Sequence, residues 1–88
     1  MRSVRRRCIP KGAVLFVAGQ PSRGVIILST RRAKLTLTSP RGQSVIVGIV
    51  GRGNVLGLEA TLSRVPHQVS AETLEPTQAN FLPAAQLT

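Results

Sequence analysis

Few side chains of this sequence are of the types that carry out chemistry, and they are scattered along the chain. His67 is the one histidine and Cys8 the one cysteine. His67 has no serine or cysteine partner in a recognisable nucleophile motif, and beside Pro66 it is interpreted as a loop residue. One thiol and one histidine cannot build a structural zinc or iron–sulfur site. We therefore expect no catalytic residue, no metal and no enzymatic activity.

The single cysteine also indicates a compartment. Cys8 follows the arginine run at residues 5–7, a cationic setting that could make its thiol reactive, although an inert, flexible thiol is the simpler interpretation. One cysteine forms no internal disulfide, so we expect a reducing, cytoplasmic environment. A signal peptide is not favoured, because Pro10-Lys11-Gly12 interrupts the passage from the arginines to a short apolar run.

The chain is strongly basic. Twelve Lys and Arg stand against three glutamates, and the net charge of +9 predicts attraction to nucleic acid or to a small anionic effector. Outside the first eight residues, however, the cations fall at expected turns and strand ends, so solvated turn charge is preferred over a continuous binding stripe. Single-strand binders stack bases on exposed aromatics, whereas Phe16 and Phe81 lie in apolar surroundings typical of a core. A small basic β-barrel that binds nucleic acid electrostatically remains the alternative.

Glycines that could cradle a phosphate lie at Gly51, Gly53 and Gly57. Their spacing is not that of a dinucleotide-binding G-x-G-x-x-G motif, because Leu56 occupies the third glycine position. The segment also does not open a long helix. A dinucleotide site is therefore excluded.

Short apolar segments, separated by glycine, proline, serine and asparagine, must position these residues. Such segments at regular spacing are typical of strands in a sandwich or barrel. The alternation over 33–38 predicts a strand with Ala33, Leu35 and Leu37 toward the core, and the continuous apolar run 25–28 predicts burial on both faces. Strands are expected at 13–17, 25–28, 33–38, 44–50, 69–73 and 78–82, with a tight reversal at 39–42 and one short helical turn within 55–63. We therefore predict an all-β fold, an antiparallel β-roll or jelly-roll (double-stranded β-helix) with at most one short helical turn and no membrane span.

The order of these parts resembles a known sensor domain. The segments that carry the resemblance are 11–20 (KGAVLFVAGQ), 24–28 (GVIIL), 33–35 (AKL), 52–57 (RGNVLG) and 69–76 (VSAETLEP). In this order they resemble the cyclic-nucleotide-binding domain, specifically the effector domain of Crp/Fnr-type bacterial transcription regulators, over residues 9–83. One departure is Arg31, where the family usually turns through glycine, and a positive φ there would cost on the order of 1 kcal/mol.

The resemblance implies a nucleotide site at the glycine-rich turn. In the family, backbone N–H groups of a short helix receive the cyclic phosphate, an arginine pairs with it, and a glutamate directly after the glycine binds the ribose. Gly57 matches the glycine, but Leu58 occupies the glutamate position, and Glu59 follows one residue later, about 100° further around a helix. The arginine position falls near Val65, so Arg64 is also displaced by one. The residues of this vestigial phosphate-binding segment are Gly57, Leu58, Glu59, Ala60 and Arg64; no cofactor is predicted, and a cyclic nucleotide is possible but not expected.

The same resemblance suggests a division of the chain. Residues 1–8 form a basic N-terminal arm, 9–83 the roll and 84–88 a tail. Family members continue into a dimerisation helix and a helix-turn-helix, which are expected to be absent from this chain, so it would not read DNA sequence alone. The roll face that packs on that helix would be exposed, favouring self-association or docking to a regulatory partner. The expected function is an effector-sensing regulatory module in signal sensing and transcription regulation; a purely structural or partner-docking roll remains open.

Overall fold

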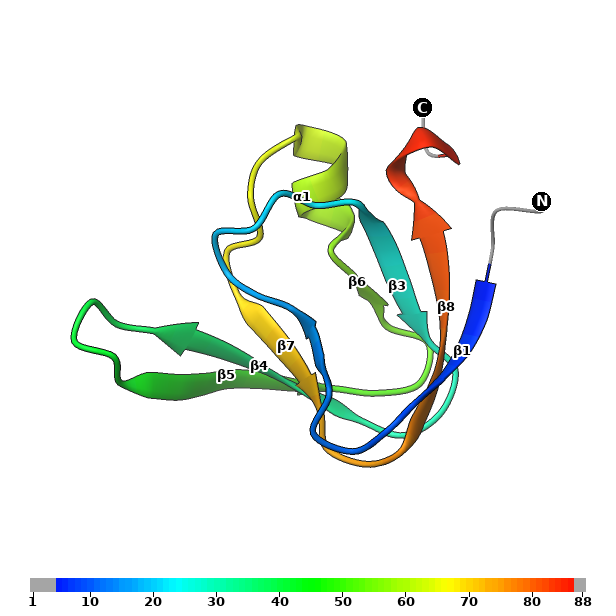
Figure 1. The fold of residues 1–88 in the computed structure, drawn as a ribbon, viewed down its shortest axis with the longest axis horizontal. Coiled ribbons are helices and arrows are strands. Elements are labelled where there is room, and N and C mark those ends of the chain that lie inside the picture. The colour runs from blue at the N-terminus through cyan, green and yellow to red at the C-terminus, as the bar shows by residue number, and fades with distance from the viewer. Residues whose placement is uncertain (1–4, 87–88) are drawn as a thin grey trace.

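Two four-stranded antiparallel sheets face each other in the computed structural model, which describes residues 5–86 (Figure 1). The predicted all-β roll is confirmed. One sheet has the order β1-β8-β3-β6 and the other β2-β7-β4-β5. The strands are β1 (Arg5–Ile9), β2 (Val14–Phe16), β3 (Gly24–Leu28), β4 (Ala33–Thr38), β5 (Ser44–Val50), β6 (Val55–Leu56), β7 (Ser70–Thr73) and β8 (Thr77–Pro83); the helix α1 is Leu58–Ser63 and a 3-10 turn covers Ala84–Gln86. Within the described range, no helix is long and apolar enough to cross a membrane.

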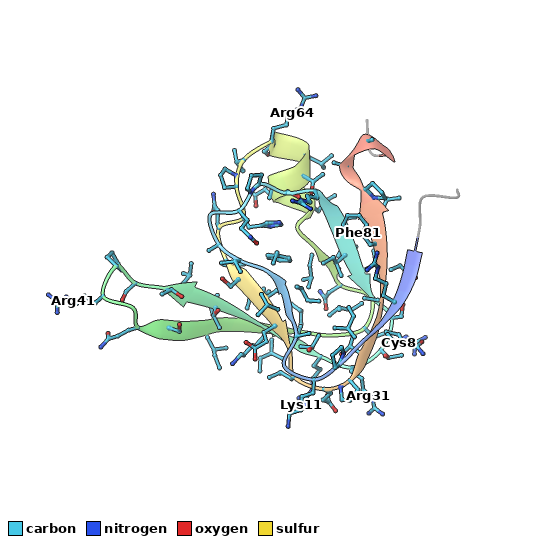
Figure 2. The ribbon with its side chains drawn as sticks, in the orientation of Figure 1. Cys8, Lys11, Arg31, Arg41, Arg64 and Phe81 are labelled. Atoms are coloured by element: carbon cyan, nitrogen blue, oxygen red, sulfur yellow. The ribbon has the colours of Figure 1, made fainter. Side chains whose placement is uncertain are left out.

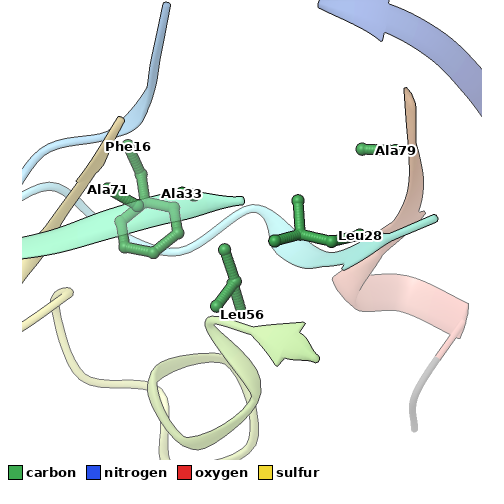
Figure 3. Close-up of a cluster of buried hydrophobic side chains, with 6 residues drawn as sticks. All are labelled: Phe16, Leu28, Ala33, Leu56, Ala71 and Ala79. Atoms are coloured by element: carbon green, nitrogen blue, oxygen red, sulfur yellow. The ribbon is translucent and has the colours of Figure 1, made fainter. Parts of the chain in front are cut away.

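The core between the sheets is made of small and medium side chains. Leu28 and Leu56 extend into the space between Phe16 and Ala79, as Figure 3 shows. The buried cluster consists of Phe16, Leu28, Ala33, Leu56, Ala71 and Ala79. Three of these six residues are alanines, so little bulk fills the interior of the roll. The continuous run 25–28 is only partly buried on both faces: Val25 and Leu28 are buried, whereas Ile26 and Ile27 are half-buried.

The N-terminal boundary of the roll differs from the prediction. Arg5–Ile9 were expected to lie mostly in an arm outside the roll, but they form β1 and pair with β8, with Arg7 opposite Ala79 and Ile9 opposite Thr77. The physical reason is that β8 has a free edge on this side, and strand pairing uses backbone groups that every residue carries. Arginines suit an edge strand because their charge disfavours further pairing. The remaining arm residues, 1–4, lie outside the described residues.

The β4–β5 hairpin extends beyond the rest of the roll (Figure 1). The prediction that Leu37 faces the core is wrong, since its side chain is 45% exposed. The neighbouring strand β7 pairs with β4 only from Ala33 to Thr36, so beyond that point β4 and β5 pair only with each other among the described residues. Large apolar side chains on both faces of β5 are consequently exposed: Val45, Ile46, Val47 and Ile49.

Candidate functional site

The segment that resembles a phosphate-binding turn folds as predicted into one short helix. Gly57 precedes α1 with φ 82° and ψ 8°, a left-handed conformation that glycine adopts without steric cost. Arg64 ends the helix, also in the left-handed region, and its backbone N–H bonds to the Ala60 carbonyl. No side chain caps the N-terminus of α1. The backbone of this segment therefore has the form that the family resemblance implies.

The predicted site residues share this segment but differ in exposure. Ala60 is buried, whereas Leu58 is 41% exposed, and Glu59 and Arg64 are exposed as well. Glu59 lies in the first turn of α1 and Arg64 at its C-terminal end. Among the described residues they form no ion pair with each other. The structure thus brings the five residues onto one short segment without joining the acid and the base.

A small hydroxyl network holds α1 against the beginning of β3. The Thr61 Oγ1 lies 2.7 Å from the Gly57 carbonyl oxygen and 3.0 Å from the Gly24 carbonyl oxygen. The Ser22 hydroxyl contacts Thr61 Oγ1 and lies 3.1 Å from the same Gly24 carbonyl oxygen. These contacts position the N-terminal turn of α1 relative to the loop that precedes β3.

His67 has a role in this region that the sequence analysis missed. It lies in a loop, as interpreted, but it is buried, and its ring stacks on Phe16 with a centroid separation of 3.9 Å and an interplanar angle of 13°. Its backbone N–H donates to the Gln20 carbonyl, and its carbonyl accepts from the Gly19 N–H. Burial lowers the pKa of His67 from its usual 6.5. The ring also lies close to Gly57: a Cβ added there would be 3.1 Å from His67 Cε1.

Within residues 5–86, no three His, Cys, Asp or Glu side chains lie together in a way that could hold a metal ion. Cys8 is a free, exposed cysteine on the edge strand β1.

The cationic side chains are distributed over the periphery of the roll. Arg41, Arg64 and Arg31 lie at well-separated corners of the molecule in Figure 2. Glu75 accepts from Arg31 at 3.8 Å and from Arg32 at 3.3 Å, and Glu72 lies 3.9 Å from Lys34, all with partial solvent exposure. Exposed pairs of this kind contribute about 0–1 kcal/mol each. Arg31, Arg32 and Lys34 are therefore surface cations with glutamate partners.

The sequence profile of the family described as "Cyclic nucleotide-binding domain" matches residues 6–88. The chain belongs to this family. The resemblance found in the sequence is thereby confirmed. A search of curated protein sequences finds no significant match.

Solved structures share the fold of this cyclic nucleotide-binding domain. A putative cAMP-binding regulatory protein from Silicibacter pomeroyi DSS-3 matches with a TM-score of 0.90 and 23% identity, over 98% of this chain and 39% of that one. The catabolite activator protein of Thermus thermophilus matches with a TM-score of 0.89 and 22% identity, over 98% of this chain and 40% of that one. The chain thus spans about two fifths of the length of these structures.

The same fold is also found within the chain of an enzyme. The cAMP-bound EAL enzyme Bd1971 matches with a TM-score of 0.88 and 20% identity, over 94% of this chain and 22% of that one. The matched part is a small fraction of that protein. At these identities the likeness establishes the fold of the cyclic nucleotide-binding domain and leaves its ligand open.

Proposed function

We propose that this cyclic nucleotide-binding domain is a non-catalytic, cytoplasmic effector-sensing module of Crp/Fnr type whose nucleotide phosphate site is degraded. The observation that carries the proposal is which residues stand at the start of α1. The position directly after Gly57 holds Leu58, whose side chain is apolar and 41% exposed and cannot accept a hydrogen bond from a ribose hydroxyl. The carboxylate of Glu59 lies one residue further along the helix, in a different direction.

The phosphate side of the site is affected in the same way. A bidentate guanidinium is the strongest protein partner for a phosphate, because its two N–H groups match two phosphate oxygens. The family position for this arginine falls at Val65, while Arg64 is exposed at the C-terminal end of α1. Backbone N–H groups of the first turn of α1 would then be the main hydrogen-bond donors to a bound anion. We therefore propose that cAMP and cGMP bind weakly, and that the effector is another small anion.

Association with other proteins is part of the same proposal. The exposed apolar side chains on both faces of β5 and those of α1, Leu58 and Leu62, support docking to a regulatory partner or self-association. Sedimentation velocity over a range of concentrations tests self-association: we expect the sedimentation coefficient to rise with concentration. A clean monomer at high concentration would leave docking to a different protein as the proposal.

The nucleotide site is tested by restoring its two side chains. Titration calorimetry with cAMP and cGMP is expected to show no saturable binding in the micromolar range for the natural sequence. The double variant Leu58→Glu/Val65→Arg returns the ribose acceptor and the phosphate partner to their family positions, and because a hydrogen bond to a charged group contributes about 1.5–3 kcal/mol, affinity should rise about tenfold or more. The matched control is Leu62→Glu/Val55→Arg, which makes the same two chemical changes at exposed positions of α1 and β6.

The outcomes separate the parts of the proposal. A micromolar dissociation constant for the natural sequence would overturn the degraded site. Equal affinities of the restored variant and its control would mean that Leu58 and Val65 do not occupy the family's ligand positions. Tighter binding by the restored variant alone, with little change in the control, would support both the assignment of the segment and its loss of function.

A further inference from the structure

A cleft of about 650 Å³ opens between the β1-β8-β3 sheet and β2, and no residue of the β4–β5 hairpin lines it. Its walls include Ile9 and Ile26 from the strands, Phe81 from β8, and the stacked pair Phe16 and His67. No residue of α1 lines it. The cleft is therefore distinct from the vestigial phosphate-binding segment.

The composition of the core explains why this space is not filled. Facing sheets lie about 10 Å apart, and large side chains from both normally interdigitate to fill the gap. Here Ala79, at the floor of the cleft, contributes only one methyl group. The size of the cleft lies within the range of about 300–1,000 Å³ that small-molecule sites occupy.

The exposed lining residues that define the mouth of the cleft include two cations, Arg7 and Arg23, and the half-buried Asn80 is a further polar residue of the lining. Arg7 lies opposite Ala79 in the β1–β8 ladder, so its side chain leaves the sheet on the same face as the cleft floor, and Arg23 borders the cleft from the loop before β3. The ion pairs of Glu72 and Glu75 are with Lys34, Arg31 and Arg32, so these two carboxylates are engaged elsewhere. The remaining acid of the sequence, Glu59, lies on α1 and does not line the cleft.

The inner end of the cleft carries a further polar group. His67 is buried there, and among the described residues its ring nitrogens make no hydrogen bond to another protein group. Gln20 also borders the cleft; its Oε1 accepts from the Val17 N–H at 3.0 Å, which leaves its amide N–H groups as donors. The cleft thus combines an apolar interior with a mouth that presents hydrogen-bond donors and positive charge.

We propose that this cleft binds an amphipathic carboxylate, with its hydrocarbon or aromatic body between Ile26, Phe16 and Phe81 and its carboxylate at Arg7 and Arg23. The apolar body of a bound ligand would remove the apolar cleft walls from water, and its carboxylate would pair with the cations Arg7 and Arg23 at the mouth. This site goes beyond the proposed function at α1 and does not depend on it.

The first test is a titration of the full chain with decanoate, monitored by two-dimensional amide NMR. The matched ligands are decanamide, with the same tail and no charge, and acetate, with the same charge and no tail. We expect saturable decanoate binding with shifts concentrated at Phe16, Ile26, His67 and Phe81, at least tenfold weaker binding of decanamide, and no saturable binding of acetate. In the same samples, the decanoate shifts at the amides of α1, Leu58–Ser63, should be smaller than those at the four cleft residues, which separates this site from the one at α1.

Two sets of variants localise the two halves of the ligand. Arg7→Gln/Arg23→Gln removes both mouth cations and should weaken decanoate at least tenfold, whereas Arg41→Gln/Arg52→Gln makes the same charge change at exposed positions that do not line the cleft and should change affinity less than twofold. Ile26→Phe adds volume to the cleft wall and should abolish binding; its thermal unfolding is recorded alongside to show that it folds.

The results that would overturn the proposal are specific. Equal binding of decanoate and decanamide would remove the role of the cationic mouth. Equal weakening by the two arginine pairs would reduce the effect to net charge. Decanoate shifts confined to Val45–Ile49 or to α1 would place the ligand on the exposed apolar surfaces instead of in the cleft.

Discussion

Replacing Thr73 with valine should substantially lower the free energy of unfolding of the roll. Thr73 is 1% exposed, and its Oγ1 accepts from the Ala13 N–H at 3.0 Å and donates to the Pro10 carbonyl oxygen at 2.7 Å. Its backbone also bonds in both directions, to the Gly12 N–H and the Ala13 carbonyl. The side chain thus holds the turn between β1 and β2 on the end of β7.

The magnitude follows from the two groups that lose their partner. Valine keeps the shape of threonine but offers no donor or acceptor, so the Ala13 N–H and the Pro10 carbonyl are left without the Thr73 hydroxyl. Each lost hydrogen bond contributes about 0.5–1.5 kcal/mol, and each part-buried polar group left unpaired adds to that, so we expect a loss of about 2–4 kcal/mol. The stability of a domain of this length is about 4–13 kcal/mol, so the change removes a large fraction of it.

Urea unfolding, followed by circular dichroism, measures this change in the free energy of unfolding. The control is Thr38→Val, which removes an exposed hydroxyl that lies 3.2 Å from the Ser44 hydroxyl on the hairpin, and which should change stability by less than about 0.5 kcal/mol. A loss below about 1 kcal/mol for Thr73→Val at an unchanged m-value would refute the reasoning. So would equal losses for the two variants.

Three further changes test other parts of the structure. Gly24→Ala should lower stability by about 3 kcal/mol in urea unfolding, because its Cβ would overlap the Leu82 carbonyl oxygen and lie 2.9 Å from Phe81 Cζ; a loss below about 1 kcal/mol would contradict the close packing of β3 on β8. Arg31→Gly should raise the thermal midpoint by a few degrees, because Arg31 has φ 68° and a left-handed non-glycine residue costs about 1 kcal/mol; a lower midpoint would show that the Arg31–Glu75 pair outweighs the strain. The lowered pKa of His67 means that the unfolded chain binds more protons between that pKa and 6.5, so the stability from its neutral ring is complete above pH 6.5 and is lost as the pH falls. His67→Phe should flatten this part of the stability profile from pH 8 to pH 5, and an unchanged profile would contradict it.

The strands were predictable because local chemistry specifies their ends. Glycine-containing turns separate the apolar runs, and the left-handed φ values of Gly12, Gly19, Gly42 and Gly53 show why those positions hold glycine. Such turns depend on a few adjacent residues and are readable from the sequence. The strand β1 was not, because three consecutive arginines carry no apolar pattern, and the strand exists through its pairing with residues more than 60 positions away in the chain.

In the candidate site, too, the features set by contiguous residues were predictable and those set by distant residues were not. Gly57 and the helix after it were predictable, since the glycine and the residues around it are contiguous. The burial of His67 was not, because it results from the stacking of its ring on Phe16 and from backbone bonds to the turn at Gly19 and Gln20, all about 50 residues earlier in the chain. The cleft is even less visible in the sequence, because a space between strands is a property of how distant side chains fail to fill it.

The cleft and the α1 segment nevertheless have two residues in common, Gly24 and His67, which line the cleft and contact α1 or Gly57. Gly24 lines the cleft and its carbonyl oxygen lies 3.0 Å from the Thr61 Oγ1 of α1, while His67 borders the cleft and lies next to Gly57. A cleft ligand that displaces His67 or the start of β3 would therefore also displace the first turn of α1. Binding free energies are reciprocal, so any change that such a ligand makes in anion affinity at α1 must equal the change that the anion makes in the affinity of the cleft. Affinities at each region that do not change when the other region is occupied would show that the two regions respond separately.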